Sequence, residues 1–405
     1  MSLVVQKYGG TSVADLDRIR SVAKRVVKTY DEGNDLVVVL SAMAGVTDSI
    51  IEMATRVTCS PDKRELDVLL STGEQTTAAL LAMTLLSMNY PAVSLLGYQA
   101  EIKTSSAFGK ARILGIGAQR IKAHIKKKKI VVVAGFQGSN ADGDITTLGR
   151  GGSDTSAVAI AAAIHADVCE IYTDVNGIYT ADPNLCEKAR KLDKISYDEM
   201  LEMASLGAKV LQLRSVEFAK KYNVAVHVRS SFSSEEGTMV VKEDSDMERL
   251  VVSGVTCNKN EARITLKKVP DQPGVAAKVF APIAKAGILV DMIIQNTRTG
   301  GETDLTFTVP ATDFKDALKI SKKIAKKIGA KEVLSAENIA KVSVTGVGMK
   351  SHSGVAAKMF EALSKENINI RLISTSEIRI SCVIEEKYAE LAVRVLHTAF
   401  GLDSE

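Results

Sequence analysis

The sequence lacks the patterns that mark secreted, disulfide-bonded or membrane-spanning proteins. Its five cysteines (Cys59, Cys169, Cys186, Cys257 and Cys382) are odd in number and scattered without a CxxC pair, which argues against a disulfide framework and against a zinc site. No run of eighteen apolar residues occurs, and the opening MSLVVQKYGG has neither the basic start nor the apolar length of a signal peptide. We therefore expect a cytoplasmic protein without a membrane span.

An excess of charge of one sign is also absent. The net charge is +4, from 52 Lys and Arg against 48 Asp and Glu, and the KKKK at residues 126–129 is the only dense basic run. That run ends a helical pattern, where a solvated helix terminus is the ordinary explanation, so nucleic acid is not an expected partner. The five histidines lie far apart without metal-ligand spacing, and no resident metal is expected.

The first 230 residues alternate buried strands with helices. A helix is expected over residues 14–31, where apolar residues recur at helical spacing. Continuous apolar runs predict strands at residues 35–41, 92–96, 130–135, 169–175 and 224–230. Such strands, separated by helices, indicate an α/β fold with a mainly parallel sheet sandwiched by helices. Ligands of such sheets bind beyond the carboxyl ends of the strands.

The last 150 residues contain an internal repeat. PGVAAKVF at residues 273–280 reappears as SGVAAKMF at residues 353–360, an offset of 80 residues. Each copy reads strand, glycine-marked turn, helix, two strands and a final helix, which predicts two α+β modules of the split βαβ type with antiparallel pairing. The polar stretch at residues 230–248 is the expected boundary between the two halves of the chain.

The stretch KYGGTSV near the N-terminus joins a strand to a helix through Gly9 and Gly10. Such a turn presents free backbone N–H groups and a positive helix end to an anion, and Lys7 adds a full charge. The spacing matches neither the P-loop nor the GxGxxG fingerprint. A glycine turn needed only for packing is the alternative on these residues alone.

A second glycine-rich stretch, TTLGRGGSDTSA, opens a helix rich in small apolar residues. Arg150 can grip a carboxylate or phosphate with two parallel hydrogen bonds, and Asp154 on the first helical turn can take an ammonium group. The alternative is a capping Asp154 beside an exposed arginine.

Three further features carry polar groups at unusual places. The loop YTDVNGIYTADP follows a strand and is either a base-binding or metal-adjacent loop or a pair of ordinary turns. Lys209 follows a glycine at the start of an expected helix, where a lysine is unfavourable unless it faces an anion. Glu74 lies in a small and apolar helical stretch, where a lone carboxylate is costly, so we expect it to bind a cationic group.

These groups are not those of acid–base or nucleophilic catalysis. Lysines, an arginine, helix N-termini and a few carboxylates are instead the parts of a phosphoryl-transfer site, which works by positioning and charge neutralisation. The sequence therefore predicts a phosphotransferase.

The motifs KYGGTSV, SAMAGVT, LLSTGEQ, TTLGRGGSDTSA, YTDVNGIYTADP and GAKVL, in this order, resemble the motif set of the aspartate kinase family in the amino acid kinase superfamily. The C-terminal repeats resemble a pair of ACT domains. The resemblance covers essentially the whole chain and implies a kinase domain at residues 1–245 and ACT domains at 246–335 and 336–405, with a strand at 250–257 that could join the second ACT sheet. It implies transfer of the ATP γ-phosphate to the side chain of L-aspartate, with Mg²⁺ as the accompanying metal.

The resemblance also implies roles for single residues. Lys7 and Asp154 are the implied catalytic residues. The ATP-binding set is Lys7, Gly9, Gly10, Ser12, Thr173, Asp174, Tyr179, Asp182 and Lys209. The aspartate-binding set is Ser41, Thr47, Glu74, Arg150, Gly152, Ser153 and Asp154.

In the ACT pair the resemblance implies feedback inhibition by lysine, threonine or both. The matching effector positions are Asp271, Gly274 and Gln295 in the first copy and Asn369, Ile370 and Ser376 in the second. A homodimer or larger homo-oligomer is implied, and Met247 is a candidate internal start for a separate regulatory chain. Two other hypotheses remain: an amino acid kinase with a different acceptor, and a non-catalytic amino-acid sensor.

Overall fold

The computed structural model describes residues 2–206, 210–244, 251–297 and 301–404. Lys209 and Met247 lie outside these residues. The chain forms two compact units: one contains residues 1–179 and 191–249, and the other contains residues 180–190 and 250–405.

The N-terminal unit is built on an eight-stranded sheet in the order β10-β12-β11-β9-β1-β2-β6-β3. Its strands are β1 (Leu3–Tyr8), β2 (Asp35–Leu40), β3 (Ala92–Leu95), β6 (Ile130–Ala134), β9 (Val168–Thr173), β10 (Lys194–Ser196), β11 (Val226–Ser230) and β12 (Thr238–Val241). All neighbours pair in parallel except β11 and β12. The mainly parallel sheet predicted from the apolar runs is confirmed, with strand ends within two residues of those expected.

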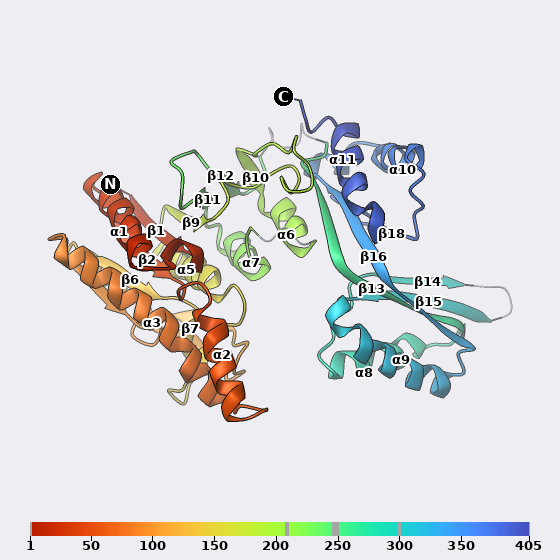
Figure 1. Cartoon of the computed structure of the whole chain (residues 1–405), viewed down its shortest axis with the longest axis horizontal. Coiled ribbons are helices and arrows are strands. Elements are labelled where there is room, and N and C mark those ends of the chain that lie inside the picture. The colour runs from red at the N-terminus through yellow and green to blue at the C-terminus, as the bar shows by residue number, and fades with distance from the viewer. Residues whose placement is uncertain (1, 207–209, 245–250, 298–300, 405) are drawn as a thin grey trace. The chain divides into compact units, whose positions relative to one another are not determined.

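Helices cover both faces of this sheet (Figure 1). The helices of the unit are α1 (Leu16–Asp31), α2 (Val46–Val57), α3 (Lys63–Ser87), α4 (Gln119–Lys126), α5 (Gly152–Ile164), α6 (Tyr197–Ser205) and α7 (Leu213–Tyr222). One apolar core lies between the sheet and α1 with α3, and the other between the sheet and α4 to α7. Side chains of a strand point alternately to the two cores, which explains why the strands read as continuous apolar runs.

Two helix starts differ from the sequence prediction. The helix expected over residues 14–31 begins at Leu16, because Gly10–Val13 form a 3-10 turn and Asp15 caps the helix by accepting a hydrogen bond from Arg18 N. The helix expected to start near Lys209 is α7, which begins at Leu213. Apolar periodicity therefore located these helices but not their first turns.

A four-stranded sheet, in the order β5-β4-β7-β8, was not predicted. Its strands are β4 (Ile102–Thr104), β5 (Ile113–Ile116), β7 (Gln137–Ser139) and β8 (Ile145–Thr147). Segments this short carry too few residues for an alternating pattern to be recognised. The sheet nevertheless matters, because β8 leads directly into the glycine-rich loop that contains Arg150.

The C-terminal unit is one antiparallel six-stranded sheet in the order β14-β15-β13-β16-β18-β17. Its elements are β13 (Gly254–Pro270), α8 (Val275–Lys285), β14 (Ile293–Thr297), β15 (Glu302–Val309), α9 (Phe314–Ile328), β16 (Glu332–Thr345), α10 (Val355–Lys365), β17 (Leu372–Thr375), β18 (Arg379–Glu385) and α11 (Ala389–Ala399). Both copies therefore have the βαββα order that the repeat predicted.

The two modules share their sheet through the long strands β13 and β16. Residues Gly254–Asn258 pair with Lys341–Thr345, and Arg263–Lys267 pair with Glu332–Ala336, with bulges around Glu261. Figure 1 shows β13 and β16 side by side, with α8 and α9 towards one end and α10 and α11 towards the other. Each long strand thus contributes its two halves to different modules.

The segment Thr180–Arg190 belongs to the C-terminal unit although the chain on both sides of it belongs to the N-terminal unit. Ala181 and Cys186 are buried in the core of the second module. The Thr180 hydroxyl lies 2.9 Å from Nε2 of the buried His397, and Arg190 Nε donates to the carbonyl of Leu402 at 2.9 Å. The loop that follows β9 is thereby divided between the two units at Tyr179.

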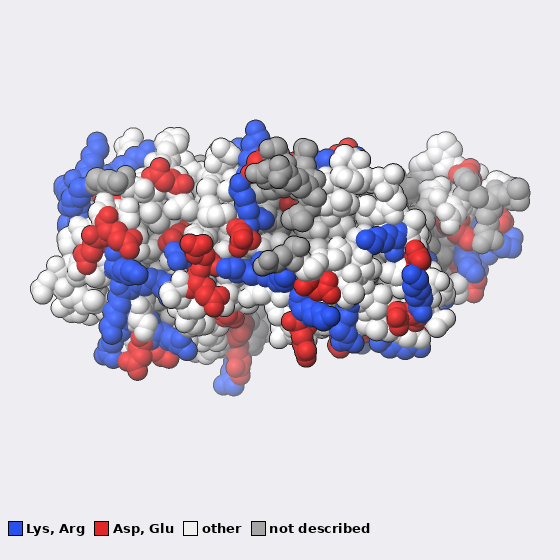
Figure 2. Space-filling model, turned by 90° about the horizontal axis from the view of Figure 1, so that it is seen from above, with Lys and Arg blue, Asp and Glu red and all other residues white. Residues whose placement is uncertain are grey.

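The surface charges are mixed, as the small net charge suggests. On the face drawn in Figure 2, Lys and Arg side chains alternate with Asp and Glu over short distances. Among the described residues, we find no helix with both the length and the apolar character needed to cross a membrane.

A buried ion cluster joins the two C-terminal modules. Lys341 on β16 is 3% exposed, and its Nζ lies 3.1 Å from Oε1 of Glu261 on β13, which is 5% exposed. Asp291, just before β14, also contacts Lys341 Nζ. Burial raises the pKa of Glu261, and the charge of Lys341 opposes that rise. Breaking such a pair on one side leaves a buried charge without its counter-ion.

We expect Lys341→Met to weaken the C-terminal unit by about 3 kcal/mol, because Glu261 stays buried without its cation. The measurement is native-state hydrogen exchange of the β13 and β16 amides. The double variant Lys341→Met/Glu261→Met removes both charges and should recover most of the loss, whereas Lys387→Met, at an exposed ion pair, should leave exchange unchanged. Equal protection in wild type and Lys341→Met would contradict a stabilising cluster.

Candidate active site

The loops after the parallel strands are joined by hydrogen bonds at one edge of the sheet, the edge formed by the carboxyl ends of the strands. Gly9 N donates to the Tyr172 carbonyl at 3.3 Å, and Ser41 N donates to the Tyr8 carbonyl at 3.1 Å. In the same way Gly135 N donates to Leu40 O and Ser231 N donates to Thr173 O. The hydrogen-bond ladder therefore continues past the carboxyl ends of the strands, where ligands of such sheets bind.

Lys7 is held at this edge by an ion pair. Its Nζ lies 2.6 Å from Oδ1 of Asp154, and each of the two side chains is 11% exposed. Lys7 comes from β1, in register with Val39 and Ile171, and Asp154 comes from the first turn of α5. Because both charges are largely out of water, each fixes the position of the other.

Close packing requires a glycine at position 10 of KYGGTSV, whereas at position 9 there is room for a side chain in ordinary contact. A Cβ on Gly10 would lie 2.9 Å from the carbonyl oxygen of Ala42, which is nearer than real Cβ contacts come. A Cβ on Gly9 would lie 3.4 Å from Lys7 Nζ, in the space beside the cation. Ser12 is buried, and its hydroxyl lies 2.5 Å from that of Ser231 in the loop after β11. The backbone can thus approach a ligand closely beside Lys7.

A polar network that sequence reasoning missed supports this edge from the other face of the sheet. Glu170 on β9 accepts hydrogen bonds from Gln6 Nε2 at 2.8 Å, from the Tyr172 hydroxyl at 3.1 Å and from Arg229 at 3.0 Å. These residues come from β1, β9 and β11, at i and i+2 positions of neighbouring strands. The alternation of side chains along each strand could have indicated which of these polar residues share a face of the sheet. Which of them contact one another depends on the order of the strands.

Arg25 of α1 connects this network to the loop after β11. Its guanidinium donates to the carbonyls of Ser231 and Ser233 at 3.2 and 3.0 Å, and lies 5.1 Å from the centre of the Tyr172 ring. The loop that holds Ser231 against Ser12 is therefore fixed by a half-buried cation.

Glu74 lies buried on α3 beside the loop after β2. Its Oε1 accepts a hydrogen bond from Ala42 N at 3.1 Å, while Oε2 is buried and has no hydrogen-bond partner among the described residues. Burial raises the pKa of Glu74 to about 7, and the Ala42 hydrogen bond opposes the rise. Ser41 precedes Ala42 at the end of β2, and Thr47 stands on the first turn of α2. A cationic ligand would satisfy the free oxygen.

The loop between β8 and α5 presents Arg150 to solvent. Gly149 and Gly151 on either side of it have φ values of +77° and +67°, a conformation that side chains rarely adopt. Gly152 begins α5, and a Cβ there would lie 2.8 Å from the Phe136 ring. Ser153 and Asp154 follow on the buried first turn. The Arg150 guanidinium makes no hydrogen bond or ion pair within the described parts of the chain and is available to an anion.

The predicted ATP-side residues after β9 are not all in one unit. Thr173 ends β9, and its hydroxyl lies 3.1 Å from an oxygen of the exposed Asp174. Tyr179 is the last residue of the N-terminal unit before the segment Thr180–Arg190, and it forms an isolated bridge with Lys191. Asp182 lies in the C-terminal unit and accepts hydrogen bonds from the backbone and side chain of Asn184. Lys209 lies outside the described residues.

The predicted effector residues lie at opposite edges of the six-stranded sheet. Gln295 is on the edge strand β14, and Asp271 and Gly274 lie between β13 and α8. At the other edge, Asn369 and Ile370 precede β17 and Ser376 follows it. One chain therefore does not bring the two sets together.

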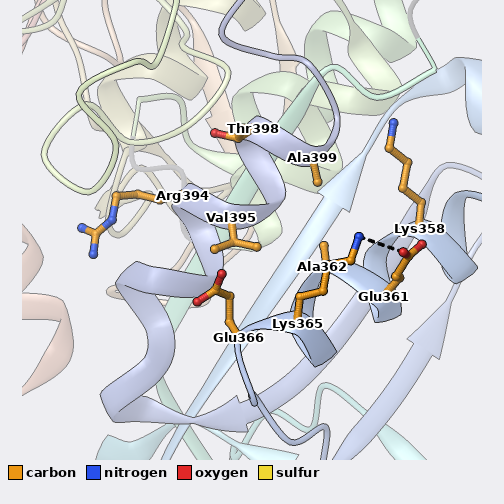
Figure 3. Close-up of a pocket in the computed structure, with 9 residues that line it drawn as sticks. All are labelled: Lys358, Glu361, Ala362, Lys365, Glu366, Arg394, Val395, Thr398 and Ala399. Atoms are coloured by element: carbon orange, nitrogen blue, oxygen red, sulfur yellow. Dashed lines mark ion pairs between the residues drawn. The ribbon is translucent and has the colours of Figure 1, made fainter.

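A surface groove in the second module lies apart from these positions. It runs between α10 and α11 and is lined by Lys358, Glu361, Ala362, Lys365, Glu366, Arg394, Val395, Thr398 and Ala399 (Figure 3). Glu361 and Lys365 form an ion pair of 2.8 Å along α10. The groove contains none of the predicted effector residues. In the described ranges no three His, Cys, Asp or Glu side chains are grouped so as to hold a metal.

Comparisons with known proteins agree with this architecture. The profile of the amino acid kinase family matches residues 2–230, and that of the ACT domain matches residues 267–323 and 342–400. An aspartate kinase of Stutzerimonas stutzeri is 57% identical over 405 residues, which are 100% of this chain and 98% of that protein. Aspartokinase III of E. coli, solved with aspartate and ADP, has a TM-score of 0.82 at 27% identity and matches 98% of this chain and 99% of its own.

A second structure of the E. coli enzyme, solved with lysine and aspartate, has a TM-score of 0.78 at 27% identity, over 98% of this chain and 99% of its own. The chain belongs to the amino acid kinase family and carries ACT domains after its kinase domain. Its identity to the Stutzerimonas enzyme over the full length places it among the aspartate kinases.

The raised pKa of Glu74 predicts a pH-dependent cost to stability. Between an ordinary pKa of 4.5 and the folded value of about 7, the folded state keeps a proton that the unfolded state has lost. The stability of the wild type should therefore fall as the pH rises through this window. Glu74→Gln keeps the acceptor for Ala42 N and removes this titration.

We expect the stability of Glu74→Gln relative to wild type to increase between pH 5 and pH 8, by at most about 3 kcal/mol. Urea unfolding followed by circular dichroism at several pH values measures it. The exposed Glu52→Gln on α2 is the matched control and should show no such trend. A difference between Glu74→Gln and wild type that does not vary with pH would refute the raised pKa.

Proposed function

We propose that this chain transfers the γ-phosphate of ATP to the side-chain carboxylate of L-aspartate, giving 4-phospho-L-aspartate, and that its ACT domains bind feedback inhibitors. The reaction is the first step of lysine, threonine and methionine biosynthesis. The observation that carries the proposal is the position of Lys7. It lies at the carboxyl ends of the parallel strands, paired with Asp154, and the glycine loop after β1 comes close to the cation.

The reaction needs no general base. The acceptor carboxylate, with a reference pKa of about 3.9, is already ionised at neutral pH. The barrier lies in bringing this anion to a phosphate that is also negative, so the groups that matter are cations and helix N-termini. Lys7 neutralises charge on the transferring phosphoryl group, and Asp154 keeps its ammonium in place.

ATP lies along the loops after β1 and β9. Gly9, Gly10 and Ser12 surround its phosphates, and Thr173, Asp174 and Tyr179 line its adenosine side, while the role of Lys209 at the distal phosphates rests on the family resemblance alone. Mg²⁺, which would accompany ATP on the side of Thr173 and Asp174, would supply further neutralisation of the phosphate charge. The small number of carboxylates at this edge fits a metal that arrives with the nucleotide.

Aspartate lies between the loop after β2, α3 and the N-terminus of α5. Arg150 takes its α-carboxylate in a two-pronged contact, and the free oxygen of Glu74 takes its ammonium group. Ser41, Thr47, Gly152 and Ser153 complete the pocket with hydroxyl and backbone N–H groups. The side-chain carboxylate is then directed towards Lys7 and the γ-phosphate.

A coupled assay of ADP production tests the activity directly. We expect ADP release that depends on L-aspartate. Release with another amino acid but not with aspartate would show a kinase of different acceptor, and amino-acid binding without turnover would show a sensor that has lost catalysis.

Lys7→Ala should lower kcat by about a thousandfold, because a charge at the reacting phosphate is removed. Asp154 is then left unpaired, so the double variant Lys7→Met/Asp154→Asn, which removes both charges, should be equally inactive and better folded. Lys24→Ala, at an exposed position on α1, is the control and should retain wild-type kcat. A retained kcat in folded Lys7→Ala would refute the catalytic role.

Regulation by lysine, threonine or both is proposed at the edges of the C-terminal sheet. The solved relative with lysine bound supports lysine as a ligand of this class of protein. Ile293 of β14 and Ile373 of β17 are exposed apolar residues on edge strands, which is unusual for an edge that stays uncovered. We infer a homodimer or larger homo-oligomer in which edges of two chains meet and bring the two effector sets together.

The five free cysteines suit the cytoplasm as the location of this protein.

Lysine and threonine, added singly and together, should inhibit the wild-type enzyme. Gln295→Ala and Ser376→Ala should raise the half-inhibitory concentration by about fivefold to tenfold, the effect of one lost hydrogen bond, while kcat without inhibitor stays unchanged. Thr398→Ala, in the groove of Figure 3, is the control within the same unit and should leave inhibition unaltered. Inhibition curves identical for all four proteins would contradict these effector positions.

A further inference from the structure

Asp67 is a completely buried carboxylate that joins three parts of the kinase unit. It stands on α3 and is 0% exposed. Both of its oxygens accept from Gly109 N, at 3.0 and 2.9 Å. Its Oδ2 also accepts from Thr147 N at 2.8 Å, and its Oδ1 from the Thr147 hydroxyl at 2.7 Å. One carboxylate thus holds the loop between β4 and β5 against the last residue of β8.

Arg214 joins the same two segments from the opposite side. It stands on the first turn of α7, and its two terminal nitrogens donate to the carbonyl of Leu148 at 2.7 Å and to that of Ala111 at 3.0 Å. Ala111 N in turn donates to Thr147 O at 2.9 Å. Burial lowers the pKa of Arg214, and the two carbonyls compensate part of that cost.

These contacts end immediately before Arg150. Thr147 and Leu148 are fixed by Asp67 and Arg214, and the next residue, Gly149, packs on the loop they hold, because a Cβ there would lie 3.0 Å from Gly109 O. Arg150 then follows on a short loop closed by the hydrogen bond from Gly152 N to Gly149 O. The base of the Arg150 loop is therefore clamped on both sides, while its guanidinium stays free.

We propose that Asp67 and Arg214 are positioning residues for Arg150, and that α3 sets the spacing of the aspartate pocket. This inference rests on the proposed function. Asp67 and Glu74 are seven residues apart on α3, about 10.5 Å along the helix axis. The same helix therefore carries Glu74, which would bind the ammonium of aspartate, and Asp67, which anchors the loop of Arg150. Arg150 would bind the α-carboxylate of aspartate.

The clamp has features that a purely structural contact does not need. Apolar packing would join these segments without burying a carboxylate and half-burying a guanidinium, both of which cost free energy on desolvation. Directed hydrogen bonds instead fix the backbone to within a few tenths of an ångström, which is the precision that a bound and oriented substrate demands.

The test measures the Michaelis constants of folded variants for both substrates. Thr147→Val removes one hydroxyl donor and keeps the backbone contacts. Asp67→Asn removes the negative charge, and Arg214→Lys removes the two guanidinium nitrogens that donate to two carbonyls. We expect the KM for aspartate to rise about tenfold or more in Asp67→Asn and Arg214→Lys and less in Thr147→Val, with the KM for ATP unchanged. Thr147→Ser keeps the hydroxyl donor and should therefore show the wild-type KM values for both substrates.

Glu65→Gln, an exposed carboxylate two residues from Asp67 on the same helix, is the control and should behave as wild type. A parallel change in both Michaelis constants, or a loss of stability in Thr147→Val with an unchanged KM for aspartate, would overturn the positioning role and leave only a structural one. If Asp67→Asn does not fold, Thr147→Val and Arg214→Lys still decide. Failure of the proposed function is separate, since the wild type itself would then release no ADP with aspartate.

Discussion

The ion pair between Lys7 and Asp154 is the contact on which the arrangement of the site depends. One partner comes from the second-to-last residue of the central strand β1 and the other from the first turn of α5. Because both side chains are nearly buried, neither can leave without exposing an unpaired charge to a poorly solvated environment. The pair therefore fixes the N-terminus of α5, and with it the loop that carries Arg150, relative to the glycine loop after β1.

Around this pair the loops are held by polar contacts from several elements. Glu170 and its partners support the ends of β1, β9 and β11 on one face, and Arg25 ties down the loop that reaches Ser12. Asp67 and Arg214 do the same for the loop after β8. Connecting loops cost conformational entropy to order, and here buried carboxylates and half-buried arginines with several hydrogen bonds offset that cost. Within the described residues, the Arg150 guanidinium and the second oxygen of Glu74, the groups proposed to bind aspartate, have no hydrogen-bond partner.

The chain after β9 links catalysis and regulation covalently. Its first part ends at Tyr179 in the kinase unit, and the next eleven residues belong to the C-terminal unit. Ala181 and Cys186 of this segment are buried in the core of the second ACT module, and Thr180 contacts His397. A loop expected to belong wholly to a nucleotide site is thus shared between the units. The shared sheet of the C-terminal unit, joined by Lys341, Glu261 and Asp291, likewise makes one body of two repeated modules.

The sequence by itself determined the classes of structure: a parallel sheet between helices, two βαββα copies, and loops with glycines, lysines and an arginine after the strands. Hydrophobic periodicity and the 80-residue repeat are local signals, and local signals suffice for these. It could not determine the four short strands of the second sheet, nor the start of α7, because too few residues carry the pattern.

Only the tertiary structure decided which polar residues meet. Asp67 is one of several acidic residues near the start of a helix, and its contacts with Gly109 and Thr147 lie 42 and 80 residues away. Lys341 meets Glu261 and Asp291 at similar separations. A buried charge is tolerated only where its partners converge, and convergence is set by strand order and helix placement, which no single stretch of sequence contains.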